Sequence, residues 1–140
     1  MARRGERSGD SRRYHDWAEA AYEDLLCSKV LREDGRLLDG CAFHCQQCAE
    51  KSLKAYLLYK AHQRIDGHNL TWLCRQAIRY EPSFQEWLDE SAKLNHYYIA
   101  TRYPTDVPVD ITPGDADVAL RMAEAIFLYV CEEIGIRFAV

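Results

Sequence analysis

The sequence predicts a single all-α domain, an up-and-down bundle of four principal helices with one short extra helix. Three observations lead to this prediction. Apolar residues recur at helical spacing in successive segments. Glycine and proline separate these segments, and no segment reads as a strand with a partner strand elsewhere. Hydrophobic residues make up 48% and charged residues 29% of the chain, which is typical of a globular domain with its own core.

The first two predicted helices span residues 11–32 and 41–61. Asp10 or Ser11 can cap the first helix, and Gly35 marks its end. Its apolar stripe consists of Trp17, Ala18, Ala21, Tyr22, Leu25, Leu26 and Ser28. The stripe of the second helix holds mostly small residues, which let another helix approach closely. Its members are Cys41, Cys45, Cys48, Ala49, Ser52 and Tyr56.

A short third helix is predicted at residues 69–79 and a fourth principal helix at residues 82–101. Pro82 suits a first-turn position of the fourth helix, and Pro104 disfavours helical geometry in the residue before it. The buried candidates of the third helix are Leu70, Leu73 and Ala77. Those of the fourth are Phe84, Trp87, Leu88, Leu94, Tyr98 and Ile99.

Residues 103–113 contain three prolines and are expected to form an extended, ordered loop. The sequence Thr112-Pro113-Gly114-Asp115 then opens the last helix, which ends before Gly135. Its buried candidates are Ala116, Ala119, Leu120, Ala123, Ile126, Phe127, Val130 and Ile134.

Residues 1–13 are predicted to be a flexible basic arm ahead of a helical domain at residues 14–137. Five arginines outnumber two acidic residues in this arm, whereas the whole chain has a formal net charge of −4. That balance argues against a generic polyanion binder. No apolar run is long enough to cross a membrane, and no apolar segment follows the first arginines as in a secretory signal. We therefore expect a cytoplasmic protein without a membrane partner, with its six cysteines reduced.

Three short motifs add to the helical pattern. Residues 43–55 read Phe-His-Cys-Gln-Gln-Cys-Ala-Glu-Lys-Ser-Leu-Lys-Ala, and they are followed by His68-Asn69-Leu70. Residues 98–104 read Tyr-Ile-Ala-Thr-Arg-Tyr-Pro. Together these motifs resemble the HEPN family, in the order of that family and over about residues 14–135.

The resemblance implies a helical bundle that usually forms homodimers. Such proteins are often encoded beside a minimal nucleotidyltransferase, in a two-gene module of toxin–antitoxin type. Several branches of the family are metal-independent ribonucleases that carry an arginine with a histidine shortly after it. Arg102 matches the arginine, but Val107, Pro108 and Val109 stand where the histidine is expected. We therefore expect a non-catalytic member without a catalytic residue. The alternative is a ribonuclease toxin that uses Arg102 with a different base.

Two polar groups are candidates for binding a nucleotide, RNA or the partner protein. On the second helix, His44, Gln47, Lys51 and Lys54 recur at steps of three and four and share one stripe. On the fourth, Asn95, Tyr98 and Arg102 do the same. Lysine, arginine, amide and imidazole groups suit a phosphate or nucleotide edge.

Structural interpretations of the same residues stay open. The stripe on the second helix can be a solvated face or include a Glu50–Lys54 pair. Arg102 can anchor the loop that follows it. The protein would then be a purely structural interaction module.

The sequence Cys41-x-x-His44-Cys45-x-x-Cys48 superficially suggests zinc, because the four residues lie on one side of a helix. A structural zinc site usually draws its ligands from two segments, since one straight helix cannot wrap a tetrahedron. We expect no metal there, and no cofactor is indicated elsewhere. The cysteines are predicted to act as small core residues.

Overall fold

The computed structural model describes residues 10–63, 65–101, 103–106 and 110–140. Within these residues every regular element is a helix, which confirms the all-α prediction. The elements are α1 (Tyr14–Asp34), α2 (Leu38–Ala61), α3 (Leu70–Ile78), the 3₁₀ helix η1 (Pro82–Trp87), α4 (Leu88–Asn95), α5 (Tyr97–Ala100) and α6 (Pro113–Ile134).

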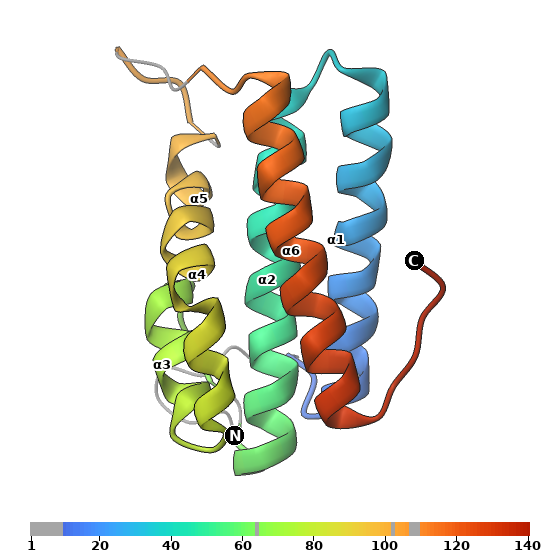
Figure 1. Cartoon of the computed structure of the whole chain (residues 1–140), viewed down its shortest axis with the longest axis vertical. Coiled ribbons are helices and arrows are strands. Elements are labelled where there is room, and N and C mark those ends of the chain that lie inside the picture. Colours follow the sequence, from blue (N-terminus) through green and yellow to red (C-terminus); the bar gives the residue numbers. More distant parts are fainter. Residues whose placement is uncertain (1–9, 64, 102, 107–109) are drawn as a thin grey trace.

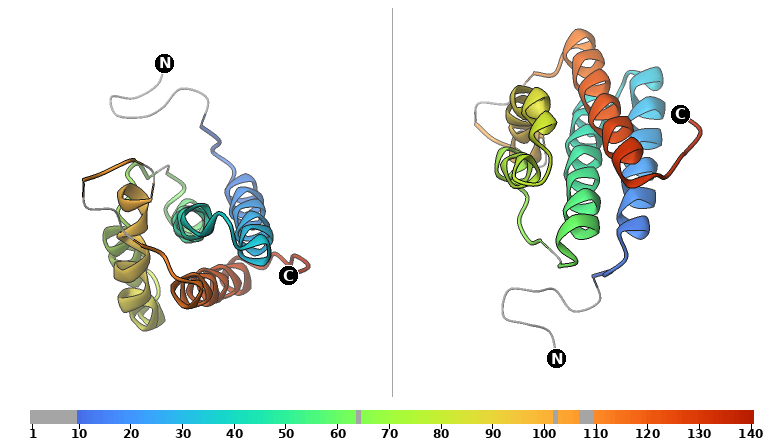
Figure 2. Two further views of the ribbon diagram at one scale, coloured as in Figure 1. Left: turned by 90° about the horizontal axis from the view of Figure 1, so that it is seen from above. Right: turned by 60° about the horizontal axis from the view of Figure 1, so that its bottom comes forward.

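The central helix of the bundle is α2. The long helices α1, α2 and α6 lie side by side, and α3, η1, α4 and α5 form a layer beside them (Figure 1). Seen from above, α1, α6 and this layer enclose α2 on three sides (Figure 2). The remaining side of α2 faces residues 66–68, which follow it in the chain. The candidate functional residues lie on that side.

Two predicted glycine stops and one predicted helix start are confirmed by the local geometry. Gly35 and Gly135 end α1 and α6 with φ values of 81° and 75°. Glycine adopts this left-handed conformation without a Cβ clash. At the start of α6, Thr112 Oγ1 accepts a hydrogen bond from the Asp115 N–H, and the Asp115 carboxylate accepts one from the Thr112 N–H. This capping box satisfies two backbone donors that the helix itself leaves free.

The predicted starts of the first two helices are wrong. Arg13 occupies the N-cap of α1 and makes no side-chain cap hydrogen bond. The Ser11 hydroxyl instead donates to Asp16 Oδ2 at 2.7 Å. The second helix begins before Gly40, which therefore lies inside it. A Cβ at Gly40 would lie 3.3 Å from Leu31 Cδ1, so close packing of α1 against α2 accounts for this glycine.

The predicted fourth principal helix is interrupted. It consists of η1, α4 and the single turn α5. Side chains three residues apart eclipse one another in a 3₁₀ helix, and η1 thereby directs Phe84 and Trp87 towards Tyr129 of α6. The ring centroids lie 4.8 Å and 5.7 Å from that of Tyr129. Packing against α6 thus explains why this segment begins as a tighter helix.

The predicted core is largely confirmed. The small stripe of α2 is buried throughout, and so are the predicted core residues of α3 and all those of α6 except Leu120, which is half-buried. Among the residues whose burial is described, the assignment of Leu26 is wrong, because this side chain is 40% exposed. The buried face of α1 runs through Ala21, Leu25 and Ser28. Leu26 is turned about 100° away from Leu25, which places it beside that face rather than on it.

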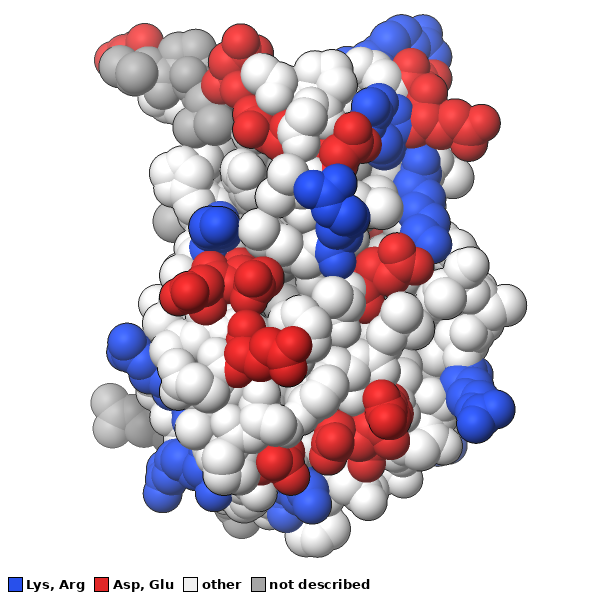
Figure 3. All heavy atoms as spheres, in the orientation of Figure 1, with Lys and Arg blue, Asp and Glu red and all other residues white. Residues whose placement is uncertain are grey.

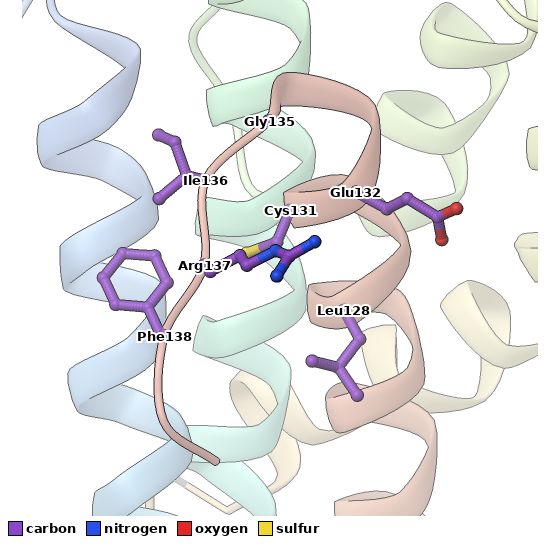
Figure 4. Close-up of a pocket in the computed structure, with 7 residues that line it drawn as sticks. All are labelled: Leu128, Cys131, Glu132, Gly135, Ile136, Arg137 and Phe138. Atoms are coloured by element: carbon purple, nitrogen blue, oxygen red, sulfur yellow. The ribbon is translucent and has the colours of Figure 1, made fainter.

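The C-terminal segment folds back along α1. Ile136 and Phe138 point towards α1, and Arg137 crosses towards α6 (Figure 4). The Phe138 ring stacks on that of Tyr22, with 4.8 Å between centroids, and the Tyr22 hydroxyl donates to the Ala139 carbonyl. These contacts bury apolar surface that the end of α6 leaves uncovered.

The surface over α1, α4 and α6 has mixed charge. Acidic side chains gather over α4 and the lower part of α6, and both signs alternate near the upper ends of α1 and α6 (Figure 3). Arg32–Asp117 and Lys29–Glu124 are ion pairs on this face. It therefore does not offer a continuous basic surface. None of the described helices is both long and apolar enough to cross a membrane.

A buried tyrosine makes the stability of the fold depend on pH in the alkaline range. Tyr56 is fully buried, and its hydroxyl has no hydrogen-bond partner among the described residues. Burial, together with the nearby Glu133 and Glu81 carboxylates, raises the pKa of Tyr56 to about 12. The folded protein therefore holds this proton more tightly than the unfolded chain, in which the tyrosine pKa is about 10. The stability that results is complete below about pH 10 and is lost as the pH rises towards 12.

We predict that Tyr56→Phe keeps or slightly raises the free energy of unfolding at neutral pH, because it removes an unpaired buried hydroxyl. The variant should also lose less stability than the wild type between about pH 10 and 12. Urea unfolding at neutral and alkaline pH measures both effects. Tyr80→Phe, at an exposed position, is the control. A loss of more than about 1 kcal/mol at neutral pH would mean that the Tyr56 hydroxyl has a partner after all.

Candidate functional site

The polar stripe predicted on α2 lies along its open side, and two buried carboxylates organise it. Asp24 comes from α1 and Glu50 from α2 itself, and their residues are 6% and 3% exposed. A carboxylate loses its hydration when it is buried, and this costs several kcal/mol unless cations and hydrogen-bond donors surround it. Each of these two acids has such partners.

Asp24 joins α1 to α2. His44 Nδ1 lies 2.8 Å from its Oδ1, and Lys51 Nζ lies 2.7 Å from its Oδ2. The two partners are seven residues apart on α2, so they lie two turns apart on nearly the same face. Pairing with both of them sets the rotation and the height of α1 against α2.

Glu50 collects polar groups from α2 and from the segment that follows it. Lys54 Nζ lies 3.2 Å and His68 Nδ1 lies 3.0 Å from its Oε2. The amide nitrogens of Gln46 and Gln47 lie 3.3 Å and 3.5 Å from its Oε1. Glu50 thereby ties the α2–α3 connection to the middle of α2.

A cleft of about 490 Å³ lies over this network. Lys51, Lys54, Gln47 and His68 line it, together with Trp17 of α1. Its lining also includes three acidic residues, Asp10, Glu50 and Asp66. Lys54 Nζ lies 5.5 Å from the centroid of the Trp17 ring, within the range of a cation–π contact. The Lys51 side chain is 27% exposed and that of Lys54 only 9%, so Lys51 is the more open of the two ammonium groups.

His68 separates this cleft from a second cavity. The second cavity, of about 360 Å³, is lined by His68, Asn69, Asn95, His96 and Tyr98. The rings of His68 and Tyr98 are stacked, with 4.7 Å between centroids and 15° between planes. One imidazole therefore contacts Glu50 on one side and an aromatic ring on the other.

A third cavity, which shares no lining residue with the other two, lies between α6 and the C-terminal segment (Figure 4). Its volume is about 440 Å³, and most of its lining is apolar, with Leu128, Ile136 and Phe138. Its charged lining residues, within the described part of the chain, are Glu132 and Arg137. The two cavities that meet at His68 hold the convergent polar groups expected of a binding site.

The family assignment rests on the length of the matching segment. Residues 14–134 match the HEPN domain, which is most of the chain and includes every helix described above. The protein belongs to the HEPN family. A comparison with curated proteins gives no match.

Two solved structures are similar to this HEPN protein. One is the crystal structure of TT1696 from Thermus thermophilus, with a TM-score of 0.79 and 28% sequence identity, covering 88% of this chain and 99% of that one. The other is the crystal structure of ST0689, an archaeal HEPN homologue, with a TM-score of 0.70 and 27% identity, covering 87% of this chain and 98% of that one. Both likenesses extend over nearly the whole of each known chain.

The HEPN fold brings most of the predicted ligand-binding residues together. His44, Gln47, Lys51 and Lys54 all belong to the network around Asp24 and Glu50. Tyr98 joins it through His68. Asn95 has a structural contact as well, because its Oδ1 accepts the Leu70 N–H at 2.8 Å and so anchors α3. Arg102, the candidate for phosphate binding and for any nuclease activity, lies outside the described residues.

The interpretation of the α2 stripe as a solvated face holds only in part. The Glu50–Lys54 pair is present, but both side chains are at least nine-tenths buried. Sequence reasoning did not name Asp24, Glu50, His68 or Trp17 as site residues. The sequence did indicate that Asp24 needs a partner, because an acidic residue inside an apolar stripe is buried and must be paired. The partner itself could not be read from the sequence, because it comes from another helix.

The cysteines of α2 lie in the core. Cys41, Cys45 and Cys48 are fully buried, whereas His44 turns towards Asp24. Burial raises the pKa of Cys48, and a hydrogen bond with Cys41, together with burial, raises that of Cys45. The same hydrogen bond lowers the pKa of Cys41. Within the residues that the structure describes, these sulfur atoms and the His44 ring do not form a group close enough to share one metal ion.

We predict that Asp24→Asn lowers the free energy of unfolding by about 2 kcal/mol or more, because Lys51 and His44 lose the carboxylate that pairs with them. Denaturant unfolding at neutral pH measures the change. Glu23→Gln, at an exposed position of the same helix, is the matched control and should stay within about 0.5 kcal/mol of the wild type. Equal effects of the two substitutions would show that Asp24 is not the link between α1 and α2.

Proposed function

We propose that this HEPN protein is a non-catalytic binding protein whose cleft on α2 accepts the phosphate of a nucleotide. The observation that carries the proposal is the convergence of Lys51 and Lys54 on one cleft, together with the Gln47 amide and the His68 imidazole. These groups are hydrogen-bond donors or cations, which suit phosphate oxygens. A cleft of about 490 Å³ falls in the usual range for small-molecule sites.

The buried carboxylates support this proposal by orienting the lysines. An ammonium group has three N–H donors, so the contact of Lys51 Nζ with Asp24 leaves two for a ligand. Ammonium groups that are already fixed lose less side-chain entropy when an anion binds. The aromatic ring of Trp17 and the stacked pair of His68 and Tyr98 lie at the edges of the same region and suit the flat base of a nucleotide.

The test is isothermal titration with nucleoside monophosphates, nucleoside diphosphates and inorganic phosphate. We predict that Lys51→Gln combined with Asp24→Asn weakens nucleotide binding about ten-fold or more, since a charge-assisted contact contributes roughly 1.5–3 kcal/mol. The double substitution removes the cation without leaving a buried carboxylate unpaired. Lys29→Gln combined with Glu124→Gln removes a similar ion pair, of 3.1 Å, away from the cleft and is the matched control.

Two results would contradict the proposal. The first is unchanged nucleotide affinity in the variant that combines Lys51→Gln with Asp24→Asn, which would leave a purely structural module. The second is metal-free RNA cleavage by the purified protein that Arg102→Ala abolishes, which would mean that the protein is an enzyme.

We further propose a homodimer, as HEPN proteins commonly form. Exposed aliphatic side chains on the outer face of α1 and just after it support this arrangement: Leu26 is 40%, Val30 66% and Leu37 60% exposed. We predict that light scattering gives the wild-type protein a mass of twice 16.3 kDa. The Val30→Asp variant should have the mass of a single chain. Val118→Asp, an exposed position on α6, is the control. A wild-type protein of single-chain mass at high concentration would contradict the dimer.

The last part of the proposal is a minimal nucleotidyltransferase partner in a module of toxin–antitoxin type. Membership of the HEPN family is its support. Co-purification of the protein with a nucleotidyltransferase encoded beside its gene tests it. Failure of the two proteins to associate when they are co-expressed would contradict it.

A further inference from the structure

The outer face of α3 combines exposed aromatic and basic side chains. Trp72, Arg75 and Arg79 recur at steps of three and four, so they share one face, and Tyr80 follows at its end. All four residues are exposed, Trp72 by 44% and Tyr80 by 49%. The opposite face holds Leu70, Leu73, Cys74 and Ala77, which are fully buried. The aromatic residues of this surface are therefore not needed for the core.

The guanidinium groups on this face are not neutralised. Arg75 has no ion-pair or hydrogen-bond partner among the described residues. The only side-chain partner of Arg79 there is the Gln76 amide oxygen, 3.1 Å from its guanidinium nitrogen. Residues 70–78 contain no acidic side chain. This contrasts with Arg32 and Arg36, which each pair with a carboxylate.

The N-terminal end of α3 adjoins the candidate site. Asn69 caps α3 by accepting the Trp72 N–H at 2.9 Å, and it also lines the cavity next to His68. His68 in turn lines the cleft that contains Lys51 and Lys54. From Trp72 to Ile78, the last residue of α3, the helix rises about 9 Å. A ligand longer than one nucleotide could thus pass from the cleft over His68 and along this face.

We propose that the outer face of α3, formed by Trp72, Arg75, Arg79 and Tyr80, is a docking surface for single-stranded nucleic acid. The inference rests on the proposed nucleotide site and extends it from a nucleotide to a strand. Exposed aromatic rings stack on unpaired bases, and unpaired guanidinium groups bind phosphates. Tryptophan, tyrosine and arginine also favour protein contacts. The link through His68 and Asn69 to the proposed phosphate site, and the absence of an acidic side chain in residues 70–78, favour a polynucleotide.

The test is fluorescence anisotropy with short, labelled oligouridylate and oligothymidylate strands, and with the same strands annealed to their complements. We expect the single strands to bind more tightly than the duplexes. Trp72→Ala should weaken single-strand binding about five-fold or more, the loss of one stacked base. Arg75→Gln combined with Arg79→Gln should lower the slope of log affinity against log salt by about 1.4. Arg36→Gln, which removes an exposed arginine elsewhere, is the charge control.

The outcomes separate this inference from the proposed function. Single-strand binding that depends on Trp72 and on the two arginines supports the inference, whether the strand is RNA or DNA. If mononucleotides bind the cleft but strand affinity is unchanged in these variants, the inference fails and the proposed function stands. If the strands bind through α3 but mononucleotides do not bind, the proposed nucleotide site on α2 is wrong. If Trp72→Ala alters the molecular mass in solution without altering strand binding, the face is a protein contact and the inference is wrong.

Discussion

The burial of two carboxylates, Asp24 on α1 and Glu50 on α2, is the constraint on which the functional side of this bundle depends. Neither acid can leave water without partners, because the desolvation of a carboxylate costs more than an ordinary side-chain contact returns. The partners of Asp24 lie on another helix, and those of Glu50 include a residue beyond the end of α2. The pairing of Asp24 therefore fixes the rotation of α1 against α2, and the pairing of Glu50 fixes the path of the connection to α3. The two carboxylates also orient the side chains of Lys51 and Lys54.

Small core residues make this arrangement possible. Cys41, Cys45, Cys48 and Ala49 are fully buried on α2 and bring α1 and α6 close to it. Because α1, α6 and the α3–α5 layer already occupy three sides of α2, its polar stripe is confined to the fourth side. The lysines there have a packed helix behind them and a cleft before them. A bundle with larger side chains on α2 would hold α1 further away, beyond the reach of Lys51 and His44 to Asp24.

The helix ends that are set by residues next to them in the sequence agree with the sequence-based prediction. The stops at Gly35 and Gly135 and the start of α6 after Thr112 lie where they were expected, because each satisfies backbone groups within a few residues. The errors occur where a distant element decides. Gly40 lies inside α2 because α1 packs against it, and η1 replaces a regular helical start because Phe84 and Trp87 both pack on Tyr129. Leu26 has a helical-stripe position but lies outside the face of α1 that α2 and α6 cover.

The sequence by itself determined the helical class of this protein, its family resemblance and the polar stripe of α2, because residue spacing along one helix sets which side chains share a face. Tertiary structure alone decided what that stripe does. The pairing of Lys51 with Asp24 and of Lys54 with Glu50, and the position of His68 between two cavities, depend on contacts across α1, α2 and the connection to α3. The physical reason is that the energy of a buried charge is set by its neighbours in space, and periodicity along one helix does not specify them.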